Sequence, residues 1–504
     1  MPTNKVLPKK SLGILMHPTS IPGGRVCGTF GKEAKEWIKM LHKYGIEYWQ
    51  FLPLTPTDST GSPYSSPSSF ALNPWFLDMD DLIERSFIFI SKKEELKQKN
   101  KSHFDFEVAN DSSKKLGRLL LQGWSYQSDD RKLDFHKWVS KNSWVEDYAT
   151  FIVIREEFNM LPWWQWPQEF KIKNDNFLNS WIKLKSEAIL IQKLIQWHLD
   201  KQWRSIKNFA KSRDIKLIGD LPFYVSRDSA DVWSNKSLFS IFKNGDLIFQ
   251  SGVPPDYFSS TGQLWGTPTY FWSKHKRTNF DWWRKRFKRQ FELVDLLRLD
   301  HFRGLAGYWR VNGSSKTAIS GRWINSPGKT LLNKLKIDLG NDFLPIIAED
   351  LGVITPDVKK LRKYFKLPGM KILQFAFDGN EDNPYLPKNI EGENWVIYTG
   401  THDNSTSFSW WECLENNAKK RIKDEYKFSE NPSWSLIKIG MDTSANLFIA
   451  PIQDILSLDD SSRLNIPGTT KNNWKWKLER PLGEIEGNVR RFSELGNNFG
   501  RTRN

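Results

Sequence analysis

The chain has 504 residues, and its 74 lysines and arginines against 58 aspartates and glutamates give a formal net charge of +16. Hydrophobic residues make up 39% of the chain and charged residues 26%, which is typical of a folded globular protein and excludes a disordered chain or a fibrous repeat. Its apolar runs are only a few residues long, far short of the roughly 18 of a membrane span, so an integral membrane protein is excluded.

The N-terminal segment does not have the form of an export signal. Its apolar run, residues 12–16, is shorter than the roughly 7 to 15 residues that a signal peptide requires, so we expect a cytoplasmic protein. Two cysteines, Cys27 and Cys413, are too few for a disulfide framework. They show no metal-ligand spacing with the histidines, so we predict no structural zinc, and since no ligand cluster for Ca²⁺ or Zn²⁺ is visible we expect no metal site.

Five segments share one form, a short apolar run that ends abruptly in polar or charged residues. Continuous apolar runs of this length are typical of parallel strands that are buried on both faces. In chain order the runs begin at Ile46, Ile215, Leu296, Pro345 and Trp395.

The segments between these runs differ in character. Residues 57–69, rich in serine and proline, predict a loop at a strand end. The region from about 91 to 203 is rich in lysine and tryptophan and shows helical periodicity, which indicates a helical insertion. An amphipathic helix is predicted over 281–297, with its basic run 284–289 on a solvated face. The alternation of strands and helices favours a parallel α/β fold, either a closed barrel or an open sheet.

Three carboxylates, Asp300, Glu349 and Asp403, stand just after apolar runs and lie about 50 residues apart. Active sites of α/β barrels are built at the carboxyl ends of the strands, so these groups could converge on one pocket. A single carboxylate in this position is more often a helix cap or a turn residue. Three in the same topological position favour catalysis.

Carboxylates without nearby metal ligands suit the chemistry of glycosidic bonds. One carboxyl group protonates the leaving oxygen, and in retaining enzymes a second acts as nucleophile. Arg298 lies two residues before Asp300, on the same face of a strand, where its guanidinium would hold Asp300 ionised and favour it as the nucleophile. From spacing alone, an ordinary ion pair is as good an interpretation of Arg298 as a role in orienting the nucleophile.

Eight motifs, spread in order over almost the whole chain, share their sequences with one enzyme family. They are HPTSIPGG (17–24), GSPYSSPSSFALNP (61–74), GDLPFYVSRDSADVW (219–233), GVPPDYFSSTGQLWGTPTY (252–270), RLDHFRG (298–304), AEDLG (348–352), GTHDN (400–404) and RLNIPGT (463–469). With these motifs the chain closely resembles the amylomaltases, the 4-α-glucanotransferases of glycoside hydrolase family 77. RLDHF and THDN also fit the wider α-amylase clan, whereas SPY, GVPPDYFS, GQLWG and LNIPGT are more specific.

The resemblance implies an α/β fold, a single (β/α)8 TIM barrel over residues 1–504 with inserted, largely helical subdomains. It also implies a mobile active-site loop at about 252–270 and retaining transfer of 1,4-α-glucan segments to the 4-hydroxyl of an acceptor. Donors and acceptors would be maltooligosaccharides and α-1,4-glucans, with glucose as acceptor or product and no cofactor.

Residue by residue, the resemblance implies that Asp300 is the nucleophile that becomes glucosylated and Glu349 the acid/base. Asp403 would be the third carboxylate, which stabilises the transition state and distorts the bound sugar. The implied substrate-binding residues are Arg298, His301, His402, Ser62, Tyr64, Asp256, Tyr257, Gln263, Trp265 and Asn465. Ser405 departs from the family pattern, because relatives often carry an acidic or amide residue there.

Glycines and prolines at 252–255 predict a loop at 256–260 that could fold over a bound glucan and exclude water. Its aromatic residues Tyr257 and Phe258 could equally form a buried plug.

Two alternatives remain at this stage. An α-glucan hydrolase would use the same carboxylates with water as acceptor, although the acceptor-side motifs favour transfer. A non-catalytic polysaccharide- or RNA-binding protein is suggested by the positive charge and the 25 tryptophans, but the basic residues are scattered and no common RNA-recognition motif appears. We expect most aromatic residues to fill the core, and neither nucleic acid nor membrane as a partner.

Overall fold

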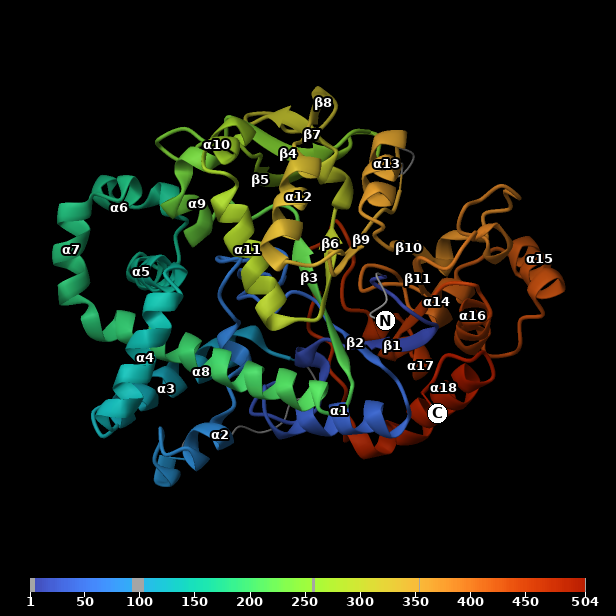
Figure 1. The fold of residues 1–504 in the computed structure, drawn as a ribbon, viewed down its shortest axis with the longest axis horizontal. Helices are drawn as coiled ribbons and strands as arrows, with labels where there is room; N and C mark the ends of the chain where they lie inside the picture. Colours follow the sequence, from blue (N-terminus) through green and yellow to red (C-terminus); the bar gives the residue numbers. More distant parts are fainter. Residues whose placement is uncertain (1–4, 93–103, 256–258, 353, 504) are drawn as a thin grey trace.

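The computed structural model describes residues 5–92, 104–255, 259–352 and 354–503. Eight parallel strands form its centre: β1 (Ser11–Leu15), β2 (Tyr48–Gln50), β3 (Lys216–Pro222), β6 (Leu296–Asp300), β9 (Ile346–Ala348), β10 (Gly369–Ile372), β11 (Trp395–Tyr398) and β12 (Leu447–Pro451). They pair in the order β10-β11-β12-β1-β2-β3-β6-β9. The two end strands meet where the N–H of Ala348 donates to the carbonyl of Pro368 at 2.9 Å, so the sheet curls into a barrel (Figure 1).

This architecture confirms the predicted TIM barrel, and the five apolar runs correspond to β2, β3, β6, β9 and β11. The helices around the strands are α1 (Lys32–Lys43), α8 (Ser186–Lys211), α10 (Trp272–Arg277), α11 (Asp281–Leu293), α12 (Gly328–Leu339), α13 (Pro356–Tyr364), α14 (Ser407–Glu412), α15 (Asn416–Tyr426), α16 (Pro432–Met441), α17 (Ile452–Ile455) and α18 (Glu486–Asn497). The alternation is broken between β10 and β11, where residues 373–394 contain two short 3-10 turns in place of an α-helix.

A helical region lies between β2 and β3, at the left of Figure 1. Its helices are α2 (Met79–Glu84), α3 (Phe106–Trp124), α4 (Asp129–Lys141), α5 (Trp144–Glu157), α6 (Gln168–Ile172) and α7 (Asp175–Leu184). The long helix α8 continues through the expected end of the insertion at residue 203. Its first half packs on α3, where Ile191 and Ile195 lie against Gly117, and its second half packs on the barrel.

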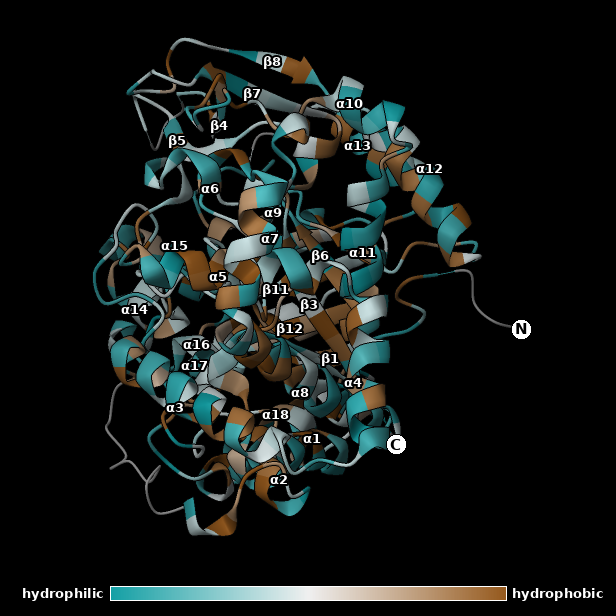
Figure 2. Ribbon diagram, turned by 90° about the vertical axis from the view of Figure 1, so that its left-hand side faces the viewer, coloured by the Kyte–Doolittle hydropathy of each residue, from teal (hydrophilic) through white to brown (hydrophobic). Residues whose placement is uncertain are grey.

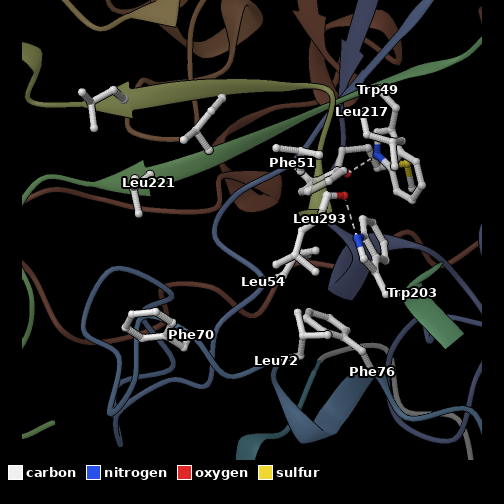
Figure 3. Packing of buried hydrophobic residues seen from close by; sticks show 14 of the residues in the cluster. Trp49, Phe51, Leu54, Phe70, Leu72, Phe76, Trp203, Leu217, Leu221 and Leu293 are labelled. Carbon is white, nitrogen blue, oxygen red and sulfur yellow. Dashed lines mark hydrogen bonds between the residues drawn. The ribbon is translucent and has the colours of Figure 1, made fainter. Parts of the chain in front are cut away.

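Aromatic side chains fill the space between α8 and the barrel (Figure 3). The Trp203 ring lies 4.6 Å from that of Phe30 and 5.3 Å from that of Phe51, between ring centroids, and its indole N–H donates to the carbonyl of Leu293 at 2.8 Å. The largest fully buried side chains include Trp37, Trp49, Trp163, Trp166, Trp197, Trp203, Trp233 and Trp283. Many of the tryptophans therefore stabilise the core through burial and are not available for stacking on a ligand.

A second sheet, not anticipated from the sequence, stands at the top of Figure 1. It is antiparallel, with the order β5-β4-β7-β8, and consists of β4 (Phe249–Val253), β5 (Gln263–Pro268), β7 (Gly307–Asn312) and β8 (Gly321–Asn325). Strands β4 and β5 belong to the segment expected to be a mobile loop, whose residues 256–258 lie outside the described part. Because β7 follows soon after the end of β6, this sheet stands beside the carboxyl ends of the barrel strands.

The exterior is largely polar, whereas the central strands are largely apolar (Figure 2). No helix in the described residues is long and apolar enough to cross a membrane.

Within the basic run of α11, the prediction of a solvated face is wrong for two residues. Arg286 is buried and donates to the carbonyls of Pro222 and Phe223, and buried Arg289 forms an ion pair with Asp200 at 2.6 Å. Both guanidiniums therefore hold α11 against the neighbouring segments. One further short helix, α9 (Ala230–Ser234), lies between β3 and β4.

Candidate active site

Asp300 is the last residue of β6 and shares its face of the strand with Arg298. The Arg298 guanidinium lies 3.0 Å from the Asp300 carboxylate and 2.6 Å from the carboxylate of Asp220. Asp220 stands on the neighbouring strand β3, in register with Arg298. The buried arginine therefore joins the carboxylates of two adjacent strands, one at a strand end and one inside a strand.

Asp220 was not among the residues predicted for the site. Its side chain is buried, and one carboxylate oxygen accepts hydrogen bonds from both Arg298 and the Tyr64 hydroxyl, the latter at 2.8 Å. The sequence carries one signal for Asp220, because it is a charged residue inside the apolar run 215–222. An ionised group within a strand that is buried on both faces requires charged or hydrogen-bonding partners. The strand pairing that supplies Arg298 is not visible in the sequence.

Burial raises the pKa of Asp300 to about 6. The Arg298 charge lowers this pKa, while the carboxylates of Asp220 and Asp403 raise it. Loss of hydration and two like charges outweigh the one guanidinium, although Arg298 favours the ionised form of Asp300 as its position two residues earlier predicts. With a pKa of about 6, Asp300 is still mostly ionised at neutral pH.

Glu349 directly follows β9 and faces the same site. One of its carboxylate oxygens accepts the backbone N–H of His301 at 2.7 Å, and the other accepts that of Leu351 at 3.0 Å. Burial and the nearby Asp300 raise the pKa of Glu349 to about 7. A glutamic acid that keeps its proton near neutral pH beside a mostly ionised aspartate is the pairing expected of a general acid and a nucleophile.

His301 contributes its backbone to this pairing. Its φ of +53° is left-handed, and this turn directly after Asp300 aims the N–H at Glu349. The imidazole points into an aromatic group, with its ring 4.9 Å from that of Trp265 at 88° and 6.0 Å from that of Tyr224. Burial lowers the pKa of His301 to about 3, so its ring is neutral. On β5, the indole N–H of Trp265 donates weakly to the Gln263 amide at 3.4 Å.

Asp403 lies in the loop after β11. His402 Nε2 is 3.3 Å from one of its carboxylate oxygens, and the Asn465 amide donates to the other at 2.6 Å. Burial alone raises the pKa of Asp403, but His402 and the Asn465 amide outweigh it and lower the pKa well below the usual range. Asp403 therefore carries a negative charge throughout the neutral and mildly acidic range.

Tyr64 contacts both Asp220 on β3 and His402 in the loop after β11. Its hydroxyl donates to Asp220, while its ring stacks on that of His402, with 5.1 Å between centroids and 14° between planes. Trp474 packs against both rings. Ser62 accepts the backbone N–H of Tyr64 at 3.3 Å, so this hydroxyl shapes the turn that presents the tyrosine.

The structure thus brings most of the predicted residues together, while Asp256 and Tyr257 lie outside the described residues. Ser405, the departure from the family pattern, accepts a hydrogen bond from Arg463 at 3.1 Å. Asp220, Arg463 and Trp474 are contacts that sequence reasoning missed. Among the described residues, no group of three or more His, Cys, Asp and Glu side chains could hold a metal ion.

Comparisons with known proteins agree on one family. A family model described as 4-alpha-glucanotransferase matches residues 16–482. The 4-alpha-glucanotransferase of Synechocystis sp. is 40% identical, covering 94% of each chain, and that of Clostridium butyricum is 38% identical, covering 95% of this chain and 99% of the relative. The solved amylomaltase from Streptococcus agalactiae, in complex with acarbose, superposes with a TM-score of 0.93 at 32% identity and covers 98% of this chain and all of that one.

Proposed function

The chain belongs to the 4-alpha-glucanotransferases of glycoside hydrolase family 77, and from that premise we propose how its residues carry out the transfer. A segment of a 1,4-α-glucan passes to the 4-hydroxyl of an acceptor glucose or glucan, by retaining double displacement through a glucosyl ester on Asp300. The observation that carries this proposal is the pair formed by Asp300 and Glu349, whose pKa values of about 6 and 7 suit a nucleophile and a proton donor.

In the first half-reaction, an Asp300 carboxylate oxygen attacks the anomeric carbon. The bond from that carbon to the glycosidic oxygen breaks, and Glu349 gives its proton to the leaving oxygen, which departs as the 4-hydroxyl of the released sugar. In the second, the Glu349 carboxylate takes the proton of the acceptor 4-hydroxyl while that oxygen attacks the anomeric carbon. The ester bond breaks, Asp300 is released as a carboxylate, and two inversions give net retention.

The surrounding groups support the charges of this cycle. The ionised Asp403 would face the positive charge that develops on the sugar ring, held in place by His402 and Asn465. Arg298, fixed by Asp220, orients the attacking Asp300. These are electrostatic contributions from groups that are already positioned before the substrate reacts.

Substrate contacts follow from the exposed groups around the carboxylates. Trp265, about one third exposed at 37%, offers an indole face next to His301 on which a sugar ring can stack. We infer that the described parts of the β4–β5 hairpin cover the bound glucan and limit the access of water, and the resemblance proposes Asp256 and Tyr257 as further substrate-binding residues. Maltooligosaccharides and α-1,4-glucans are the proposed donors and acceptors, and the acarbose bound to the Streptococcus agalactiae amylomaltase supports a glucan ligand. A cytoplasmic location also remains a proposal.

The product pattern tests the reaction class directly. Purified enzyme is incubated with maltotriose alone, with and without a chelator, and products are resolved by length over time. We expect glucose together with a ladder of longer maltooligosaccharides, at the same rate in both buffers. Glucose and maltose without longer products would make water the acceptor and the enzyme a hydrolase, and inactivation by the chelator would contradict a cofactor-free reaction.

The raised carboxyl pKa values predict a narrow pH optimum. Activity requires Asp300 deprotonated, so kcat/KM rises as the pH increases through about 6, and it requires Glu349 protonated, so kcat/KM falls as the pH increases through about 7. Because the two carboxyl groups titrate together, the two pKa values read from this profile belong to the pair and not to either residue alone. Initial rates with maltotriose at subsaturating concentration, from about pH 4.5 to about pH 9, give the profile. A profile that lacks either the acid limb or the alkaline limb over this range would contradict the assignment.

A further inference from the structure

The loop that carries His402 and Asp403, residues 399–406, joins β11 to α14 without forming part of a sheet. Few backbone hydrogen bonds fix it. The N–H of Asn404 donates to the carbonyl of Thr401, and the carbonyls of Thr399, His402 and Thr406 accept from the N–H groups of Gln374, Asn465 and Trp410. An irregular loop of this kind takes its position from the side chains that bind it. The placement of Asp403 therefore depends on residues elsewhere in the chain.

Asp454 fixes the two ends of the loop. This buried aspartate, in α17 just after β12, accepts the backbone N–H of Ser407 at 2.7 Å and its hydroxyl at 2.7 Å. Its carboxylate also accepts the hydroxyl of Thr399, at the other end of the loop. Both ends are thus held against one carboxylate, and the middle of the loop, where Asp403 lies, needs a separate support.

Arg463 contributes three donors of one guanidinium to that support, beside the Gln374 amide, which donates to the carbonyl of Ser405 at 2.9 Å, and the N–H of Asn465, which donates to the carbonyl of His402 at 3.2 Å. Nη2 donates to the carbonyl of Asp403 at 2.6 Å, Nε donates to the carbonyl of Asn465 at 2.7 Å, and Nη1 donates to the Ser405 hydroxyl at 3.1 Å. The Asn465 amide in turn donates to the Asp403 carboxylate at 2.6 Å. One rigid fork therefore fixes the carboxylate residue and the residue whose amide orients it, on two segments about 60 positions apart in the sequence.

We propose that Arg463 is a positioning residue for the reaction, which sets the distance and orientation of Asp403 by holding it to Asn465. This inference rests on the proposed function, because it requires that Asp403 act on the bound sugar. Displacement of a catalytic group by about 1 Å can cost about 100-fold in rate. Lysine cannot replace the fork, since its single ammonium cannot reach three acceptors in one plane.

The test compares Arg463→Gln and Arg463→Lys with wild type, using maltotriose as substrate. We expect kcat to fall about 100-fold in the glutamine variant and at least about tenfold in the lysine variant, while KM changes by less than about threefold. Arg490→Gln is the matched control. It removes the same charge from an exposed position on α18, where the arginine has one distant contact to Glu494 at 3.7 Å, and wild-type kinetics are expected.

A double-mutant cycle separates positioning from a general loss of structure. If Arg463 acts through Asn465, then Asn465→Ala combined with either Arg463 variant loses no more activity than the more damaged single variant. Losses that multiply would overturn the inference, as would wild-type kcat in Arg463→Gln. The lysine variant keeps the cycle usable if the glutamine variant does not fold.

Asp403→Asn distinguishes failure of this inference from failure of the proposed function. If that variant keeps transfer activity, Asp403 has no catalytic role and the proposed function is wrong at this residue. If it is inactive while Arg463→Gln works normally, the catalytic role of Asp403 stands and only the positioning role of Arg463 is refuted.

Discussion

Replacing Asp300 by asparagine is expected to lower transfer from maltotriose at least about 10⁴-fold while glucan binding persists. Asparagine has nearly the same shape, and its amide oxygen can still accept a hydrogen bond from Arg298. It cannot form the glucosyl ester, so the first half-reaction stops. Glucose release by initial rates and acarbose binding by calorimetry measure the two properties separately.

The matched control is Asp342→Asn, which removes one carboxylate from an exposed position ahead of β9 and should leave the kinetics unchanged. Arg298 keeps its ion pair with Asp220 in the Asp300 variant, so the fold should survive. Residual transfer above about one part in a hundred would assign the nucleophile to another residue.

Replacing Glu349 by glutamine is expected to lower kcat with maltotriose about a thousandfold, because glutamine has no acidic proton for the leaving oxygen. A maltosyl fluoride donor needs no such proton, since fluoride leaves as the anion. The first half-reaction should therefore proceed with this donor, and the ester on Asp300 should accumulate because the base of the second half-reaction is missing. Mass spectrometry of the intact protein detects the added maltosyl group.

Glu479→Gln serves as the control, since this glutamate is exposed and should have no influence on either donor. The assignment of Glu349 fails if the fluoride donor is impaired as strongly as maltotriose, or if no glycosylated protein forms with it.

Much of the barrel could be predicted because strands buried on both faces consist of continuous apolar runs. Strand β12 has the same apolar character and was within reach of that pattern. Strand β10 was not, because it contains Lys371, whose ammonium lies over the rings of Trp395 and Tyr385, 4.6 and 4.9 Å from their centroids. The antiparallel sheet could not be predicted, because its strands, such as β8, contain exposed residues and carry no continuous apolar run.

The three carboxylates could be predicted because their position after a strand is a local property of the sequence. Asp220 could not be assigned in this way, since only the register between β3 and β6 places it opposite Arg298. Arg463 and Trp474 come from a segment beyond β12 that returns to the site. No local pattern shows which loop they will contact, so the second layer of the site depends on the folded chain.

Helix α8 runs unbroken for 26 residues, about 39 Å, from the helical region into the barrel wall. Its first half packs on α3 and its second half carries Trp203 into the barrel core, so the helical region and the barrel should denature in one cooperative transition. Cutting the chain near residue 203 to exchange the insertion would divide this helix and expose an aromatic cluster to water. Any recombination with a relative therefore has to carry α8 whole, together with the strand β3 that follows it.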